Sequence, residues 1–261
     1  MKLSISNIAW DKEEDSSMYD YLQQQKINGI EIAPTRIFES NPYDHLEEAE
    51  NYRAFLYKKG IEVSSIQSIW YGRQENIFLS EQDMKALEEY TQKAILFAER
   101  LNCKNLVFGC PRNRNVNGEM TIGKLNNVVE FFRRVGEFAY THNTCFSLEP
   151  NPKMYNTNFI NTTNEAIEMV KRVGCPGFKV NLDFGTIIAN SENVNMIDVT
   201  YVNHVHISEP GLSNIKSRQE HKELVSKLRK NKYDGYISIE MSKSDLETVK
   251  KTISYLKSLE D

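Results

Sequence analysis

The chain has 261 residues, with 32 Lys+Arg against 36 Asp+Glu, a formal net charge of −4, and 40% hydrophobic and 26% charged residues. These are ordinary values for a soluble globular protein. The mild acidity disfavours nucleic-acid binding by phosphate neutralisation. Its longer apolar runs, such as 94–98, fall far short of the roughly 18 residues of a membrane helix, and the N-terminus has no hydrophobic signal segment. We therefore expect neither a nucleic-acid nor a membrane partner.

Four cysteines occur, Cys103, Cys110, Cys145 and Cys175. No pair has the spacing of a metal finger, and a chain of this length can build a core without disulfides. We expect reduced thiols in a cytoplasmic protein. A catalytic role for Cys110 is the alternative, although no histidine lies near it in the sequence.

Strand and helix patterns alternate along the chain. Short β-branched or apolar runs predict eight strands, at 3–8, 27–33, 61–66, 105–109, 144–149, 178–183, 202–207 and 235–240. Amphipathic spacing and capping residues predict helices at 16–26, 41–59, 80–101, 123–141, 161–172, 220–231 and 244–259. Only the segment between the sixth and seventh strands is short and weakly helical.

This alternation requires parallel strands, because each strand is followed by a crossover. Eight such units predict a single (β/α)8 TIM barrel with parallel strands and an outer ring of helices, as one domain over 1–261. The alternative is an open, doubly wound sheet. That fold favours a glycine-rich turn after the first strand, whereas residues 6–15 (SNIAWDKEED) contain no glycine.

The C-terminal ends of barrel strands carry the working residues of such folds. The fifth to eighth predicted strands end at Glu149, Asp183, His206 and Glu240. Burying three carboxylates beside a histidine is costly unless a divalent cation holds them together. A mostly oxygen-based set suits Mn²⁺, Mg²⁺ or Co²⁺, with Zn²⁺ a further candidate. A single acid at a strand end is more often a helix cap or a loop residue, but four at corresponding places indicate a site.

The motifs around these strand ends are SLEPNP, NLDFG, HVHISEP and YDGYISIE, with GIEIAP earlier in the chain. In this order the sequence resembles the xylose isomerase-like TIM barrel superfamily, the sugar isomerase and epimerase group that includes endonuclease IV. The resemblance implies that Glu149, Asp183, His206 and Glu240 bind one divalent metal and that the two glutamates flank the substrate. Endonuclease IV has further histidines where this chain has Gln67 and Cys110, so a multi-zinc nuclease site is disfavoured.

The resemblance predicts a metal-dependent isomerase or epimerase acting on a carbohydrate, a sugar or sugar derivative. A metal polarises the carbonyl, Glu149 or Glu240 removes the neighbouring proton, and a metal-stabilised enediolate forms. A keto-polyol (inosose-type) dehydratase shares this step, and a barrel that binds sugar or metal without turnover is a further alternative. Outer helices of such barrels often pair, so by family analogy we expect a homodimer.

Further residues near the strand ends are candidates for substrate binding. They are Trp10, Glu31, Gln67, Trp70, Asn151, Lys153, His204 and Glu209. Loop packing explains the tryptophans equally well, interior packing explains His204, and a solvated loop explains Asn151 and Lys153. Tyr71 belongs with the tryptophans. The basic residues Arg112 and Arg114 could clamp an anionic group, although a solvated loop is the commoner explanation.

Three positions depart from the pattern of the sugar epimerases in this group. Thr186 stands where a histidine is usual, Tyr155 stands near an expected glutamate, and Lys216 and Arg218 lie further along than an expected arginine. Such residues normally hold substrate hydroxyls. The sequence therefore predicts an intact metal centre with a different substrate-recognition set, which leaves 3-epimerisation of the usual free ketoses in doubt.

Overall fold

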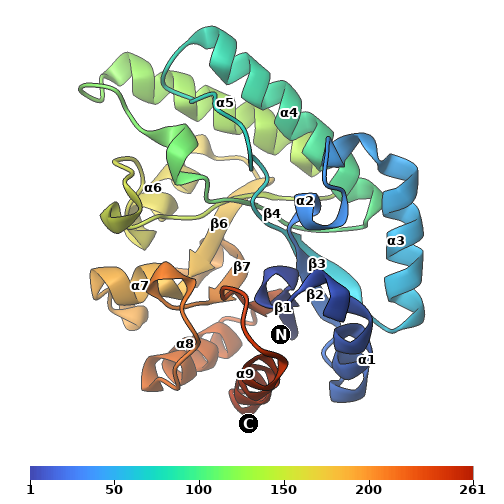
Figure 1. Cartoon of the computed structure of the whole chain (residues 1–261). Helices are drawn as coiled ribbons and strands as arrows, with labels where there is room; N and C mark the ends of the chain where they lie inside the picture. Colours follow the sequence, from blue (N-terminus) through green and yellow to red (C-terminus); the bar gives the residue numbers. More distant parts are fainter. Residues whose placement is uncertain (261) are drawn as a thin grey trace.

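The computed structural model describes residues 1–260, and it contains a closed barrel of eight parallel strands in the order β1 to β8 (Figure 1). The strands are β1 (Lys2–Ser6), β2 (Gly29–Ile32), β3 (Glu62–Ile66), β4 (Leu106–Phe108), β5 (Phe146–Leu148), β6 (Phe178–Asp183), β7 (Val202–Ile207) and β8 (Tyr236–Ile239). The eight predicted strands and the TIM-barrel fold are confirmed. The doubly wound alternative is wrong, because β1 also pairs with β8 and closes the sheet.

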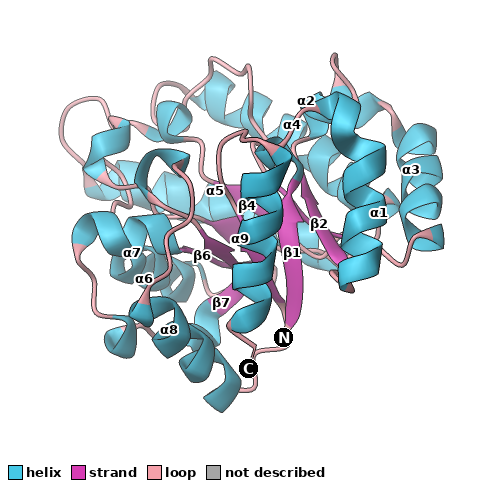
Figure 2. Ribbon diagram, turned by 60° about the horizontal axis from the view of Figure 1, so that its bottom comes forward, coloured by secondary structure: helices cyan, strands magenta, loops and turns pink. Residues whose placement is uncertain are grey.

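Helices surround the strands on the outside of the barrel (Figures 1 and 2). They are α1 (Asp15–Gln25), α2 (Pro34–Ile37), α3 (Leu46–Lys58), α4 (Glu81–Arg100), α5 (Ile122–Thr141), α6 (Thr163–Val173), α7 (Phe184–Asn190), α8 (Gln219–Lys230) and α9 (Leu246–Ser258). The short helix α2 was not predicted. No helix within residues 1–260 combines the length and the hydropathy that crossing a bilayer requires.

Helix ends follow the local sequence. Thr162 and Glu165 form a complete capping box at the start of α6, and Gly174 ends it with a left-handed φ of 63°. Ser80 caps α4 by accepting a hydrogen bond from the Asp83 amide at 3.0 Å. The capping residues therefore predicted the starts of α4 and α6 to within one or two residues.

The predicted helix 41–59 is instead two elements. A 3-10 turn, Pro42–Asp44, is followed by a break at His45, and α3 begins at Leu46. The Tyr43 side chain explains the break, because its hydroxyl donates to the carbonyl of Ile69 at 2.8 Å and its ring is buried against Tyr90. The partner of this anchor, Ile69, lies outside the predicted helix, so the periodicity of residues 41–59 does not reveal the contact.

Alternating residues of each strand face the helices or the barrel interior. In β1, Leu3 and Ile5 belong to the apolar core, whereas Ser4 reaches across the interior to the hydroxyl of Ser64 at 2.6 Å. Ser65, Asn105 and Ser147 form another buried chain of hydrogen bonds, at 2.9 and 2.6 Å. The interior is therefore able to hold charged groups through hydrogen bonds, which an aliphatic interior does not offer.

Gly177, directly before β6, lies against the backbone of α5. A Cβ atom at this position would lie 2.1 Å from the carbonyl oxygen of Gly136 and 2.8 Å from the amide nitrogen of Tyr140. Both atoms are backbone, so relief requires the helix to move. We expect Gly177→Ala to lower the free energy of unfolding by about 1–3 kcal/mol, as overpacked cores do, measured by urea denaturation.

Gly123 is the matched control because it lies in the exposed first turn of the same helix. Its nearest atom to an added Cβ is the Thr121 hydroxyl at 3.8 Å. Gly123→Ala should raise stability by about 0.5–1 kcal/mol through helix propensity. A Gly177→Ala protein as stable as the parent would show that α5 does not press on this loop.

Candidate functional site: an acidic cavity around His206

Four neighbouring strands bring acidic and imidazole side chains to one end of the barrel. Asp183 is the last residue of β6, and the ladder pairs it with His206 of β7. Glu149 and Glu240 directly follow β5 and β8, and their amides donate to Phe108 and Ile207 carbonyls at 3.0 Å. The strand-end argument thus correctly places all four residues at the same end of the barrel.

Two of the carboxylates converge on one nitrogen of the imidazole. His206 Nδ1 lies 3.1 Å from Glu149 Oε2 and 3.2 Å from Glu240 Oε2. The three residues offer ligand atoms within 4.8 Å of one another, a grouping suited to a metal ion. His206 is fully buried, and the two glutamate side chains are 13% exposed. The carboxylates therefore meet the imidazole at the edge of the accessible space.

Asp183 is held by a separate set of bonds beside that trio. Its Oδ2 accepts from the amide and hydroxyl of Thr186, at 2.7 and 2.8 Å, and its Oδ1 accepts from the Ser208 hydroxyl. Asp183 is therefore the N-cap of α7, the ordinary role of a strand-end acid. It also lines the same cavity as Glu149 and Glu240, so the two roles coexist.

The cavity in front of these residues has a volume of about 180 Å³. Its lining includes four carboxylates, those of Glu149, Asp183, Glu209 and Glu240. The other lining residues are Gln67, Ser68, Val107, Gly109, Cys110, Pro111, Asn151, Tyr155, Ser208 and Leu212. A wall of carboxylates, amides and hydroxyls with a few apolar side chains suits a small polar molecule.

The electrostatics of the cluster show an excess of negative charge. Burial raises the pKa of Asp183, and the nearby Glu149 raises it further. Burial also raises the pKa of Glu240, with His206 opposing. Burial alone would lower the pKa of His206, but Glu31 and Glu240 outweigh it and hold that pKa well above its ordinary value. A divalent cation among these groups would relieve the repulsion, so the donor set fits one.

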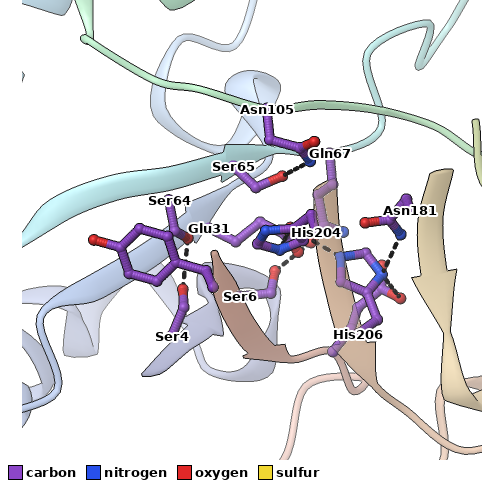
Figure 3. Close-up of polar contacts among 12 residues, drawn as sticks. Ser4, Ser6, Glu31, Ser64, Ser65, Gln67, Asn105, Asn181, His204 and His206 are labelled. Atoms are coloured by element: carbon purple, nitrogen blue, oxygen red, sulfur yellow. Dashed lines mark hydrogen bonds and ion pairs between the residues drawn. The ribbon is translucent and has the colours of Figure 1, made fainter. Parts of the chain in front are cut away.

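Glu31 and His204 lie deeper in the barrel and are not among the residues that line the cavity. Glu31 Oε2 is 2.9 Å from Nε2 of His206 and 3.1 Å from Nε2 of His204 (Figure 3). Burial favours a higher pKa for Glu31, but the two imidazoles hold it well below its ordinary value. Both residues were predicted to bind substrate, and the structure puts them behind the cavity floor.

The predicted substrate-binding residues divide into two groups. Gln67, Asn151 and Glu209 line the cavity. Trp10 and Trp70 do not: each is 1% exposed, and their indole nitrogens donate to Asp15 and to Thr91, both at 2.8 Å. They pack within the protein because their loops fold back, which strand-end position alone does not reveal.

The charged loop residues also avoid the cavity. Lys153 is exposed and does not line it, and Tyr71 is 71% exposed. Arg112 is exposed, whereas Arg114 is fully buried and donates to the carbonyls of Glu149 and Ile160, at 2.7 and 3.4 Å. Its guanidinium therefore supports the backbone of Glu149 rather than clamping an anion. Burial lowers the pKa of Arg114 to about 10.

Glu209 is bound to its own loop. Arg218 donates to both of its carboxylate oxygens, at 2.7 and 2.6 Å, and the Lys216 amide adds a third bond at 3.2 Å. Burial by itself would raise the pKa of Glu209, but the Arg218 bonds hold it below its ordinary value. This pair keeps the loop after β7 folded against the cavity.

Two contributors to the site were missed from the sequence. Asn181 donates to Glu149 Oε2 at 2.7 Å and lies 3.2 Å from Nδ1 of His206, and Ser208 holds Asp183. Asn181 lies two residues before Asp183 on β6, and Ser208 lies two residues after His206, just beyond β7. The two-residue period of a strand was the signal that could have found them.

Comparison with known proteins agrees with this geometry. The family model described as xylose isomerase-like TIM barrel matches residues 19–259. Among curated protein sequences, none matches the chain.

Solved structures similar to this chain share its fold at low sequence identity. The E. coli 3-keto-D-glucoside 4-epimerase is 18% identical, with a TM-score of 0.79 over 100% of this chain and 99% of its own. A D-psicose 3-epimerase is 17% identical, with a TM-score of 0.76 over 92% and 85%. A probable 3-DHS dehydratase from Bacillus anthracis is 17% identical, with a TM-score of 0.71 over 100% and 99%. With the family model matching most of its length, this chain belongs to the xylose isomerase-like TIM barrel family.

Proposed function

We propose that this protein is a divalent-metal-dependent isomerase or epimerase of a sugar or sugar derivative. One observation carries the proposal: Glu149 and Glu240, from strands on opposite sides of β6 and β7, meet His206 Nδ1 at 3.1 and 3.2 Å on the wall of a small polar cavity. Two carboxylates this close together can act as the general base and the general acid that transfer a proton at a carbon next to a carbonyl.

Glu149, His206 and Glu240 would hold the cation, with Asp183 beside them. When bound, it supplies a Lewis acid that polarises the substrate carbonyl and makes the neighbouring C–H more acidic. The raised pKa values of Asp183 and Glu240 support this assignment, because uncompensated buried negative charge is costly. Mn²⁺, Mg²⁺ and Co²⁺ suit three carboxylates and one imidazole, and Zn²⁺ is the fourth candidate.

The protein's own groups would then move the proton. One glutamate removes it from the substrate carbon, and the other returns it in an epimerase, or the same one in an isomerase. Asn181 fixes Glu149 by its 2.7 Å bond to Oε2, and Asn151 donates to Oε1 at 3.2 Å. Glu149 is thereby oriented from both oxygens. Gln67 and Tyr155 offer polar atoms for substrate hydroxyls along the same wall.

A keto-polyol dehydratase is the second candidate, favoured by the likeness to the probable dehydratase structure. It shares proton removal next to a carbonyl and then expels a β-hydroxyl. Loss of water from the product distinguishes it from the first proposal. A barrel that binds a carbohydrate without turnover is the third.

Incubation of the protein with a panel of ketoses, aldoses and keto-polyols in D₂O, with Mn²⁺, tests the proposal. We expect deuterium at a carbon next to a carbonyl in at least one compound, detected by NMR after removal of the metal, and no incorporation in the presence of EDTA. Incorporation with an epimeric or isomeric product supports the first proposal, and a dehydrated product supports the second. Binding without incorporation across the panel would leave the third.

A further inference from the structure

His206 is placed between two different acidic environments. Its Nδ1 faces Glu149 and Glu240 at the cavity, and its Nε2 faces Glu31 in the barrel interior at 2.9 Å. A neutral imidazole carries one proton, which sits on only one of these nitrogens. Which nitrogen it occupies decides whether the cavity side offers a lone pair.

Carboxylates on both sides of the ring compete for its proton. On the cavity side, Glu149 Oε2 and Glu240 Oε2 lie 3.1 and 3.2 Å from Nδ1, and the Asn181 amide nitrogen lies 3.2 Å from it. A cation held by the two glutamates would take the Nδ1 lone pair, which leaves the proton on Nε2, where Glu31 Oε2 lies 2.9 Å away as an acceptor. The tautomer that cation binding needs is therefore the one that Glu31 favours.

The Glu31 carboxylate is fixed by its burial and by two imidazole contacts. It is fully buried, and its Oε2 lies between the rings of His204 and His206, at 3.1 and 2.9 Å (Figure 3). Its Oε1 has no hydrogen-bond partner among residues 1–260. A buried carboxylate with so few partners is expensive to fold around. The free-energy cost of burying Glu31 is explained if its carboxylate orients His206.

We infer that Glu31 is a positioning residue: it holds the proton of His206 on Nε2 and turns the Nδ1 lone pair toward Glu149 and Glu240. His204 braces the carboxylate from its other side. This inference rests on the proposed function, because the lone pair matters when a cation binds there. Carboxylates that hydrogen-bond a ligating histidine typically contribute about 10–100-fold to metal affinity.

Two variants and one control test the assignment through Mn²⁺ affinity, measured by calorimetry and by EPR. Glu31→Met removes the acceptor with little loss of volume, and its Kd should rise about 10–100-fold. Glu31→Gln keeps an acceptor oxygen without charge, and its Kd should fall between those of Glu31→Met and the parent. The control is Glu62→Gln, which removes the same charge from a half-exposed carboxylate that contacts Lys2 and Tyr236 at the other end of the barrel. Its Kd should equal that of the parent.

The tautomer itself gives a readout that needs no variant. In the parent protein with Mg²⁺ or Zn²⁺ bound, two-bond ¹H–¹⁵N correlations of His206 should show a protonated Nε2 and an unprotonated Nδ1. A proton on Nδ1, or a folded Glu31→Met protein with the parent Kd, would overturn the inference. If Glu31→Met does not fold, Glu31→Gln and the NMR spectrum decide. A parent protein that binds none of these cations would instead overturn the proposed function.

Discussion

Glu240→Gln should lower the rate of deuterium incorporation by about 10²–10⁴-fold at saturating Mn²⁺, because glutamine has the shape of glutamate but cannot take a proton from carbon. The residue follows β8, its carboxylate reaches His206 Nδ1 at 3.2 Å, and it lines the cavity. The measurement is the initial rate of exchange in D₂O for whichever compound of the panel reacts, at several Mn²⁺ concentrations.

The metal titration separates the two roles of Glu240. A rate restored by more Mn²⁺ would assign it to holding the cation alone, whereas a rate that stays low at saturation assigns it to proton transfer. The control is Glu168→Gln on α6, an exposed carboxylate paired with Lys171, which should exchange at the parent rate. Parent-rate exchange by a folded Glu240→Gln protein with both epimers of the reacting compound would remove Glu240 from the mechanism.

Glu149→Gln completes the comparison. If two bases act on opposite faces of the substrate carbon, one variant still removes the proton from one epimer while the other variant removes it from the second epimer. If a single base acts, only one of the two variants loses exchange with both. The outcome distinguishes an epimerase from an isomerase without a new structure.

The barrel could be predicted from the sequence because the patterns that specify its strands and helices are local and repeat along the chain. Each strand is a short apolar run, helices such as α4 and α6 begin at a side-chain cap, and β1 to β8 follow from those runs within a few residues. The break at His45 was missed because it depends on where Tyr43 is anchored, a contact with Ile69 that lies 26 positions away. Local patterns contain no information on such contacts.

The site residues that lie at strand ends could be predicted from the sequence. Glu149, His206 and Glu240 converge because parallel strands end at one rim, a rule that needs only the strand boundaries. The loop residues obey no such rule, so Trp10 and Trp70 turned inward while Gln67 and Asn151 lined the cavity. Glu31 was placed at the correct strand end, but its partners His204 and His206 come from β7, and local sequence patterns do not reveal contacts so distant in the chain.

The stability of the protein should fall between pH 6.5 and 4 partly because of His221, which is buried on α8. Its Nδ1 lies 2.8 Å from the Tyr255 hydroxyl on α9, and its ring packs on Phe184 at 4.1 Å between centroids. Burial lowers its pKa from 6.5 to about 4, against the opposing carboxylate of Glu209. Above pH 6.5 the ring is neutral in both the folded and the unfolded chain, so its titration costs nothing.

Below pH 6.5 the unfolded chain binds a proton at His221 that the folded chain does not, and each pH unit down to about 4 then favours unfolding. The shift corresponds to a loss of up to about 3 kcal/mol across this window. The loss should be absent in His221→Gln, whose amide can still bond Tyr255. Urea denaturation at pH 7, 6, 5 and 4.5 measures it as a shallower decline in the free energy of unfolding for the variant than for the parent. Parallel curves for His221→Gln and the parent would show that this ring is protonated equally in both states, and hence that α8 and α9 open readily enough to hydrate it.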